Sequence, residues 1–170
     1  MKKLALAAAM LVGLTGAAIA ADPVHADRSG FYVGGNIGSS TDQKNRIDLG
    51  MTAGYQYGKY VRVEADYDHA WRTSGTGNRL MGNAVAQYRI PNSTVTPYIL
   101  MGAGVGFDKF GNVKSSGDIV GLYNVGAGVR IAVSESVELD ARYRNVRPFD
   151  TKNVGVKEQN IFTVGANYRF

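Results

Sequence analysis

Cysteine is absent from the 170 residues of this chain, and histidine occurs only twice. The absence of cysteine excludes disulfides, thiolate metal sites and cysteine nucleophiles. Two histidines leave little from which to build a histidine-based metal or catalytic site. Proline is also scarce, with 4 residues, whereas glycine reaches 22 and tyrosine 10. The charge is mildly basic, with 19 Lys and Arg against 14 Asp and Glu, and an excess this small does not indicate a nucleic-acid partner.

The one long apolar run lies at the N-terminus. Lys2 and Lys3 precede an apolar segment over residues 4–20, which ends with the small-x-small sequence Ala18-Ile19-Ala20. A basic start, a short apolar stretch and small residues at its end are typical of a secretory signal peptide. We therefore expect residues 1–20 to be a signal peptide and residues 21–170 to form one domain outside the cytoplasm. A membrane anchor is the alternative, although the segment is short and alanine-rich for a bilayer span.

Beyond residue 21 the dominant pattern is an alternation of apolar and polar residues. No apolar run there is long enough for a helical membrane span, but the strands of a membrane β-barrel alternate and so remain possible. Turn-like stretches separate eight alternating segments, and no stretch shows a helical period. We predict strands over 30–38, 46–57, 61–71, 79–90, 95–107, 118–132, 136–145 and 161–170.

The two faces of these predicted strands differ sharply, because successive side chains of a strand point to opposite faces. One face is apolar and contains no Asp, Glu, Lys or Arg. The other face is polar or small, with many glycines. It carries six acids and six bases, namely Asp48, Arg62, Glu64, Asp66, Asp68, Arg89, Arg130, Glu138, Asp140, Arg142, Arg144 and Arg169.

The apolar face is either the core of a soluble barrel or sandwich or the lipid-facing wall of an outer-membrane barrel. Three features favour the second. The chain has a predicted signal peptide, and aromatic residues of the apolar face gather at strand ends, with Tyr55 and Tyr57 at one end and Trp71 and Phe107 at the other. Balanced charges and small residues also suit an eight-stranded interior, which is just wide enough for side chains. We predict an all-β fold, an eight-stranded antiparallel transmembrane β-barrel of up-and-down topology.

The predicted connections alternate in length. Outer-membrane barrels have short periplasmic turns and longer outer loops, so we expect the longer connections outside and both termini in the periplasm. The short connections are 58–60, 91–94 and 133–135, and the longer ones are 39–45, 72–78, 108–117 and 145–160.

Several of these segments resemble a known family. Gly30-Phe31-Tyr32-Val33-Gly34-Gly35 resembles its first strand, and residues 96–107, 126–130 and 137–144 resemble its fifth, sixth and seventh. The ending is similar to the C-terminal signal recognised by the barrel assembly machinery. The alternating residues Phe162, Val164, Ala166, Tyr168 and Phe170 carry that likeness.

Together these segments resemble the small outer-membrane β-barrel family, which includes OmpA-like transmembrane domains and opacity-type surface proteins. The resemblance implies a place in the outer membrane of a Gram-negative bacterium, assembly by the barrel assembly machinery, and a structural or surface-interaction role without a cofactor. Larger OmpA-like proteins add a peptidoglycan-binding domain and opacity adhesins have longer loops. We therefore expect neither cell-wall tethering nor strong adhesion.

The inward charges are expected to form a network in the barrel lumen. Buried ions are costly unless they are paired and hydrogen-bonded, and equal numbers of acids and bases favour pairing. We predict a polar plug. The alternative is a gated path for ions or small solutes, and conductance measurements distinguish the two. The predicted network consists of Arg62, Glu64, Asp66, Arg130, Glu138, Asp140, Arg142 and Arg144.

His69 is the one candidate for catalysis. It lies on the apolar face near the outer rim, beside Trp71. Some eight-stranded barrel enzymes modify lipopolysaccharide with a rim histidine, a serine and an acid, but the spacing here resembles none of them. We therefore predict no enzyme activity, no catalytic residue and no metal site, with a lipid A-modifying enzyme as the alternative. The run Gly102-x-Gly104-x-Gly106 is not followed by the helix that a nucleotide-binding loop requires.

The longer loops are basic. A solvated surface is the simplest explanation of these charges. The functional interpretation is charge-assisted hydrogen bonding to the phosphates of lipopolysaccharide or to a host or other extracellular ligand such as a sulfated glycan. The loop bases of this prediction are Lys44, Arg72, Lys109, Lys114, Lys152 and Lys157, with Arg46, Arg79 and Arg147 also counted to the loops.

Overall fold

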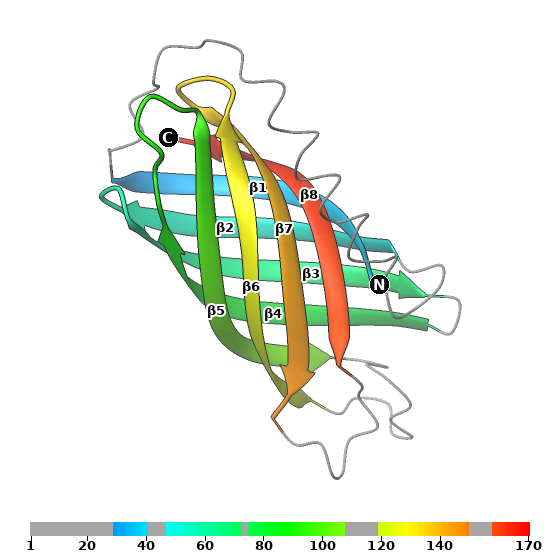
Figure 1. Ribbon diagram of the computed structural model, residues 1–170. Coiled ribbons are helices and arrows are strands. Elements are labelled where there is room, and N and C mark those ends of the chain that lie inside the picture. The colour runs from blue at the N-terminus through cyan, green and yellow to red at the C-terminus, as the bar shows by residue number, and fades with distance from the viewer. Residues whose placement is uncertain (1–28, 41–46, 73–74, 108–118, 150–157) are drawn as a thin grey trace, which may run out of the picture.

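A computed structural model of the chain shows a closed barrel of eight strands (Figure 1). The structure describes residues 29–40, 47–72, 75–107, 119–149 and 158–170. Every pairing between neighbouring strands is antiparallel, so the predicted up-and-down barrel is confirmed. The strands are β1 Gly30–Ser40, β2 Ile47–Tyr57, β3 Val61–Arg72, β4 Gly75–Gln87, β5 Val95–Phe107, β6 Val120–Ala132, β7 Val137–Pro148 and β8 Gln159–Arg169.

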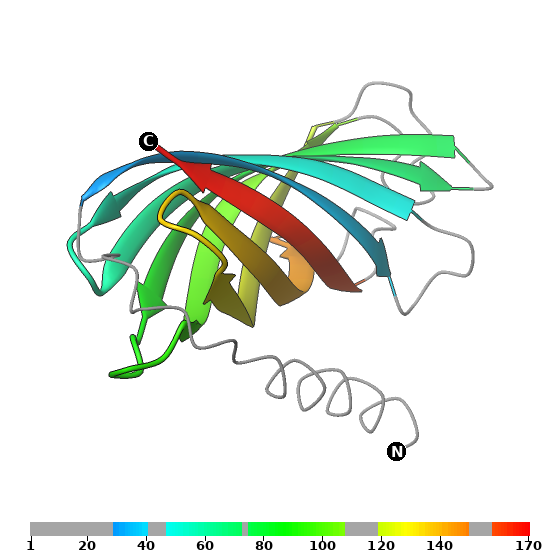
Figure 2. The same cartoon turned by 90° about the horizontal axis from the view of Figure 1, so that it is seen from above.

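The first and last strands close the sheet. β1 pairs with β8 from Tyr32↔Arg169 to Ser40↔Ile161, and the two strands lie side by side in both views (Figures 1 and 2). Each strand therefore has two hydrogen-bonded neighbours, and the described sheet has no open edge. Closure of this kind satisfies the backbone N–H and C=O groups within the barrel, which hydrocarbon surroundings require.

The two side-chain sets divide between the outside and the inside of the barrel. Met51 and Met101 have exposed fractions of 69% and 65%, whereas Tyr32 and Met81 on the opposite face are each 1% exposed. The same alternation holds along all eight strands, because the chain direction reverses but the two-residue period does not. The wall of large exposed hydrophobic side chains is therefore the outer surface of the barrel.

Aromatic residues gather at both ends of this outer wall. The β2–β3, β4–β5 and β6–β7 connections and the C-terminus lie at one end, which we call the turn end (Figure 1). There the ring centroids of Phe31 and Tyr55 are 4.8 Å apart, and those of Tyr168 and Phe170 are 5.3 Å apart. At the opposite end, the loop end, the ring centroids of His69 and Trp71 are 4.3 Å apart. These two groups correspond to the interfacial girdles of outer-membrane barrels.

The fourth strand differs from its predicted range. It spans Gly75–Gln87 instead of 79–90, so the predicted long connection over 72–78 shortens to residues 73 and 74. Gly75 and Gly77 fall within the predicted connection, but both pair with β3, for example Ala70↔Gly77. The connection after β4 is correspondingly longer than predicted and covers 88–94. Pairing with a long partner strand here outweighs the weak strand preference of glycine.

Tight turns at the turn end use backbone conformations that suit their residues. Gly58 and Asn92 have φ values of 58° and 57°, the left-handed region that glycine and asparagine tolerate best. The Gln56 side chain caps the first of these turns by donating to the Gly58 carbonyl at 2.7 Å. Each of these turns fixes the register between the two strands that it connects.

Several predictions concern parts of the chain outside the described residues. They include the signal peptide over 1–20 and the loop residues Lys44, Arg46, Lys109, Lys114, Lys152 and Lys157. Within the ranges that the structure does describe, no helix has both the length and the apolar character needed to cross a membrane.

Candidate functional site: the barrel interior and the outer rim

The inner face of the barrel brings charged side chains together. Arg89, which was predicted to belong to this set, lies beyond the end of β4 and is half-buried. Arg79, which was predicted to be a loop base, instead lies within β4 and is 1% exposed. The prediction for Arg79 was wrong because β4 begins four residues earlier than the alternation suggested. The inward charges are Asp48, Arg62, Glu64, Asp66, Asp68, Arg79, Arg130, Glu138, Asp140, Arg142, Arg144 and Arg169.

Nearest the turn end, Arg62 and Glu138 form a two-pronged ion pair. The Arg62 Nη1 and Nη2 atoms each lie 2.9 Å from a Glu138 carboxylate oxygen. Arg169 also donates to Glu138 and reaches the Gln56 side-chain oxygen at 3.1 Å. The Tyr32 ring lies against Arg62, with 4.9 Å between the ring centroid and the guanidinium carbon. Parallel hydrogen bonds of this kind are the strong geometry for arginine and carboxylate.

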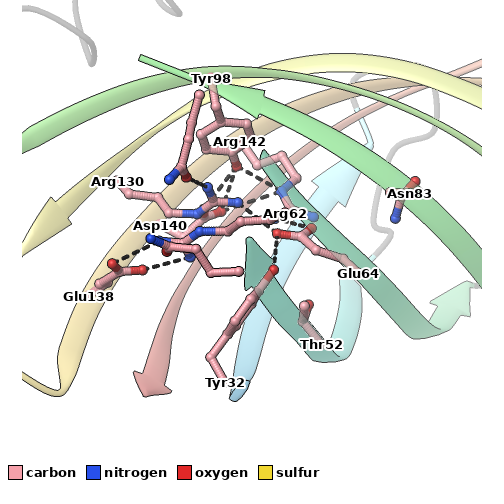
Figure 3. A network of polar contacts seen from close by, with 12 residues as sticks. Tyr32, Thr52, Arg62, Glu64, Asn83, Tyr98, Arg130, Glu138, Asp140 and Arg142 are labelled. Carbon is pink, nitrogen blue, oxygen red and sulfur yellow. Dashed lines mark hydrogen bonds and ion pairs between the residues drawn. The ribbon is translucent and has the colours of Figure 1, made fainter. Parts of the chain in front are cut away.

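In the middle of the barrel, two arginines lie between two carboxylates (Figure 3). Arg130 is 2.7 Å from Glu64 and 3.1 Å from Asp140, and Arg142 is 2.9 Å from Glu64 and 3.5 Å from Asp140. The Tyr98 hydroxyl accepts from Arg142 Nε at 2.8 Å and donates to Asp140 at 2.8 Å. Like charges are thereby separated by opposite ones throughout this layer, which offsets part of their desolvation cost.

Toward the loop end, two aspartates on β3 hold the next layer. Asp66 is 3.0 Å from Arg142 and 3.2 Å from Arg144. Asp68 is 3.0 Å from Arg144 and 3.2 Å from Arg79. Asp66 also accepts from Thr52 at 2.6 Å and from Asn83 at 2.8 Å. Asp66 therefore has both charged and neutral donors, and Asp68 has two arginines.

An apolar cluster lies on the inner face near the loop end. Leu122 and Ile161 are fully buried there, with exposed fractions of 0%. Polar side chains share this level of the barrel, because Val146 pairs with Asn124 and Gln159 and the Arg79 guanidinium reaches the Gln159 side-chain oxygen at 3.4 Å. The cluster consists of Met81, Val120, Leu122, Val146 and Ile161.

The two strands that supply most of these charges are complementary repeats of one another. β3 reads Val-Arg-Val-Glu-Ala-Asp-Tyr-Asp from Val61, and β7 reads Val-Glu-Leu-Asp-Ala-Arg-Tyr-Arg from Val137. The strands stand four places apart in a ring of eight and are therefore opposite each other. Residues at equivalent positions of the repeat pair across the barrel, as Arg62–Glu138, Asp66–Arg142 and Asp68–Arg144. The order of charges along the two repeats therefore determines which residues pair across the barrel.

Two inward tyrosines occupy space left by glycines. A Cβ atom added to Gly54 would lie 2.5 Å from the Tyr32 phenol, and one added to Gly128 would lie 2.5 Å from the Tyr98 phenol. The Tyr32 hydroxyl donates to Glu64 at 2.7 Å. Both tyrosines therefore reach the charged layer because the facing position has no side chain.

Sequence reasoning missed Tyr32, Tyr98 and Arg79 as members of this network. The tyrosines fall on the polar parity of β1 and β5, and their hydroxyls bond acids two strands away. The signal that could have found the pairings was the charge-inverted repeat of β3 and β7. The predicted assembly residues lie on the outer face of β8 and at the chain end, where Tyr168 and Phe170 are 50% and 77% exposed.

The outer face carries two similar polar clusters at the loop end. On β3 and β4, the Asn78 side-chain oxygen accepts from the Tyr67 hydroxyl at 2.8 Å and contacts His69 Nδ1 at 2.6 Å. On β7 and β8, the Asn160 oxygen accepts from the Tyr143 hydroxyl at 2.5 Å and from Asn145 at 2.8 Å. The second cluster continues into an ion pair between Arg147 and Glu158, 2.9 Å apart.

The remaining predicted bases are placed only in part. Arg72 is the last residue of β3, and Arg147 lies within β7 on its exposed face. Among the residues the structure describes, no group of three or more His, Cys, Asp or Glu side chains is arranged to hold a metal ion.

Comparisons with known proteins agree with this architecture. A family model described as outer membrane protein β-barrel domain matches residues 5–170, and the search of curated proteins finds no match. The chain is similar to the N-terminal β-barrel domain of Pseudomonas aeruginosa OprF, at 17% identity and a TM-score of 0.68, covering 84% of this chain and 97% of that one. It is also similar to OprH from P. aeruginosa, at 19% identity and a TM-score of 0.65, covering 83% and 99%. Neisserial surface protein A matches at 20% identity and a TM-score of 0.59, covering 84% and 96%.

Proposed function

Since this chain belongs to the family of outer membrane protein β-barrel domains, we propose that it is a closed, non-conducting barrel whose role in the bacterial outer membrane is structural or in surface contact. The apolar outer wall contacts lipid and the paired charges fill the lumen as a plug. The longer loops and the outer rim contact lipopolysaccharide or extracellular ligands.

The cross-barrel ion pairs carry this proposal. Glu64, Asp66 and Asp68 each have at least one guanidinium within 3.2 Å, and all three side chains are almost fully buried. An eight-stranded barrel leaves little interior space beyond its own side chains. A conducting path would have to break several of these pairs at once and would also have to displace buried side chains around Leu122.

Conductance in planar lipid bilayers tests the proposal. We expect the purified full-length protein to produce no steady single-channel current, because the pairs and the apolar cluster close the lumen. The matched variant Leu122→Ser makes the apolar cluster more polar without altering an ion pair. We expect that it still does not conduct, because the ion pairs remain. A steady open current from the unaltered protein contradicts the plug and supports the alternative, a small-solute channel.

Contact with lipopolysaccharide rests on charge and position. Outer-leaflet lipopolysaccharide carries phosphates, for which arginine and lysine are suitable donors. The predicted loop bases Lys44, Lys109, Lys114, Lys152 and Lys157 lie outside the described residues, in the sequence segments after β1, β5 and β7, and Arg147 is exposed near the end of β7. A host or other extracellular ligand would meet the same basic surface.

We infer that the barrel is not an enzyme. His69 bonds to Asn78 and packs against Trp71. These contacts favour an interfacial polar role for this histidine over the acid–base role that lipid A modification needs.

Export and assembly complete the proposal. Residues 1–20 have the features of a cleaved signal peptide. The alternating outward residues of β8 and the terminal Phe170 present an exposed apolar strip that suits recognition by the barrel assembly machinery.

A further inference from the structure

An oblique groove crosses the outer wall of the barrel, beneath the first of the two rim clusters. It has a volume of about 870 Å³ and is lined by residues of β1, β2, β3, β6, β7 and β8. Its lining includes small residues such as Gly35 and Ala166 and larger apolar residues, namely Ile37, Leu49, Met51 and Leu139. These side chains belong to the lipid-facing wall, so the groove opens to the hydrocarbon of the membrane.

One end of the groove is polar. Tyr67 and His69 both line it, and both contact the Asn78 side-chain oxygen, at 2.8 and 2.6 Å. If His69 Nδ1 donates to that oxygen, Nε2 of the neutral ring is free to accept from a hydroxyl. In the protonated ring, Nε2 donates instead, and a phosphate oxygen is a suitable acceptor. Trp71 packs edge-on against the His69 ring at 4.3 Å and limits its rotation. The polar end lies at the aromatic girdle of the loop end, at the level of lipid headgroups.

We propose that this groove holds one acyl chain of a lipopolysaccharide molecule whose sugar-phosphate headgroup contacts His69. The inference rests on the proposed function, because it requires the loop end to face the outer leaflet. An apolar slot with a hydrogen-bonding end matches an amphipathic lipid in both chemistry and direction. A second copy of the barrel fits less well, since two facing hollows would leave a void where protein contacts are normally close-packed.

The second rim cluster provides an internal comparison. Tyr143, Asn145 and Asn160 repeat the geometry of Tyr67, His69 and Asn78 on the opposite strands. Tyr143 and Asn145 do not line the groove. Tyr143→Phe removes one hydroxyl from this second cluster without altering the groove, which makes it a control for the first cluster.

Native mass spectrometry of the full-length protein, released from bilayers containing lipopolysaccharide and phosphatidylethanolamine, tests the proposal. We expect the unaltered protein to retain one lipopolysaccharide molecule and Gly35→Leu to lose it. A Cβ added at Gly35 has only the Gly50 carbonyl nearby, at 3.9 Å, so the new side chain fills the groove without a backbone clash. Gly82→Leu is the control, because Gly82 is equally open, with Ala103 O at 3.8 Å, and lines a separate hollow of about 570 Å³. It should keep the bound lipid.

The headgroup contact is tested in the same assay. His69→Ala should lower lipopolysaccharide retention, and Tyr143→Phe should leave it unchanged. The heat-dependent gel shift of each variant verifies folding, and Ala166→Leu replaces Gly35→Leu if the latter does not fold.

Three results would overturn the groove assignment. They are equal retention by Gly35→Leu and Gly82→Leu, a preference for phosphatidylethanolamine over lipopolysaccharide, and no retained lipid on the unaltered protein. Steady conductance of the same preparation would instead contradict the plug, whatever the lipid result, so the two proposals fail separately.

Discussion

At the scale of single residues, the interior depends on positions where a side chain is missing as much as on those where one is present. Tyr98 reaches Asp140 and Arg142 because Gly128 faces it across β5 and β6. The Tyr98 ring also lies 3.9 Å from the Arg130 guanidinium carbon, close enough for a cation–π contact. One glycine therefore allows a tyrosine to bridge charges from two strands.

Gly128→Ala tests this dependence. The added Cβ would lie 2.5 Å from the Tyr98 phenol and 2.6 Å from the Ala141 carbonyl oxygen, and the backbone atom cannot move aside cheaply. Overpacking of this kind costs about 1–3 kcal/mol, and we expect that loss in urea unfolding from lipid vesicles. Gly82→Ala, whose Cβ meets its nearest neighbour at 3.8 Å, should change the unfolding free energy by less than about 0.5 kcal/mol. Equal effects of the two variants contradict the proposed packing.

The residue scale is also where sequence reasoning was weakest. The alternation assigned Glu64 and Arg142 to the inner face without assigning them partners. Pairing depends on register and on closure, which place β3 opposite β7, and neither follows from a two-residue period. Arg79 was misplaced because the alternation does not show that Gly75 and Gly77 extend β4 by pairing with β3.

At the scale of strands, β3 and β7 act as a complementary pair. Three equivalent positions have opposite charges and meet across the barrel. At the fourth, Glu64 and Asp140 have the same charge, and Arg130 from β6 lies between them. The outward positions of the two strands, by contrast, are similar and not complementary, as Tyr67 and Tyr143 illustrate. The complementarity is therefore confined to the face where the strands meet.

Charge reversal tests the pairing of these strands. Arg62→Glu should destabilise the barrel by about 3–5 kcal/mol, because it leaves Glu138 facing a like charge in a buried site. Adding Glu138→Arg restores the pair in reverse and should recover part of the loss. Recovery stays incomplete because Arg169 also contacts Glu138 in the unaltered protein. Losses that simply add in the double variant, measured by the same unfolding assay, would show that the two residues do not interact.

At the scale of the whole molecule, the barrel reverses the arrangement of a soluble protein, because its charges lie inside and its large hydrophobic side chains lie outside. Eight antiparallel ladders close on themselves and leave no free edge in the described sheet, as hydrocarbon surroundings demand. This level was the most predictable from sequence, since an apolar face without a single charge, aromatic residues at strand ends and balanced inner charges all follow from the period. The strand ends at β4 and the apolar cluster around Leu122 were not predictable, because they depend on pairing partners and not on the alternation.

The most direct test of this inversion is the depth dependence of an arginine placed on the outer wall. Met101 lies in the middle of β5 and is 65% exposed, whereas Ile119 lies just before β6 at the loop end and is 66% exposed. If the wall faces lipid, Met101→Arg should destabilise the barrel folded in lipid vesicles by about 2–4 kcal/mol. Ile119→Arg should destabilise it by only about 0–1 kcal/mol. Equal and negligible losses at the two positions would contradict a membrane-spanning wall and, with it, the whole account.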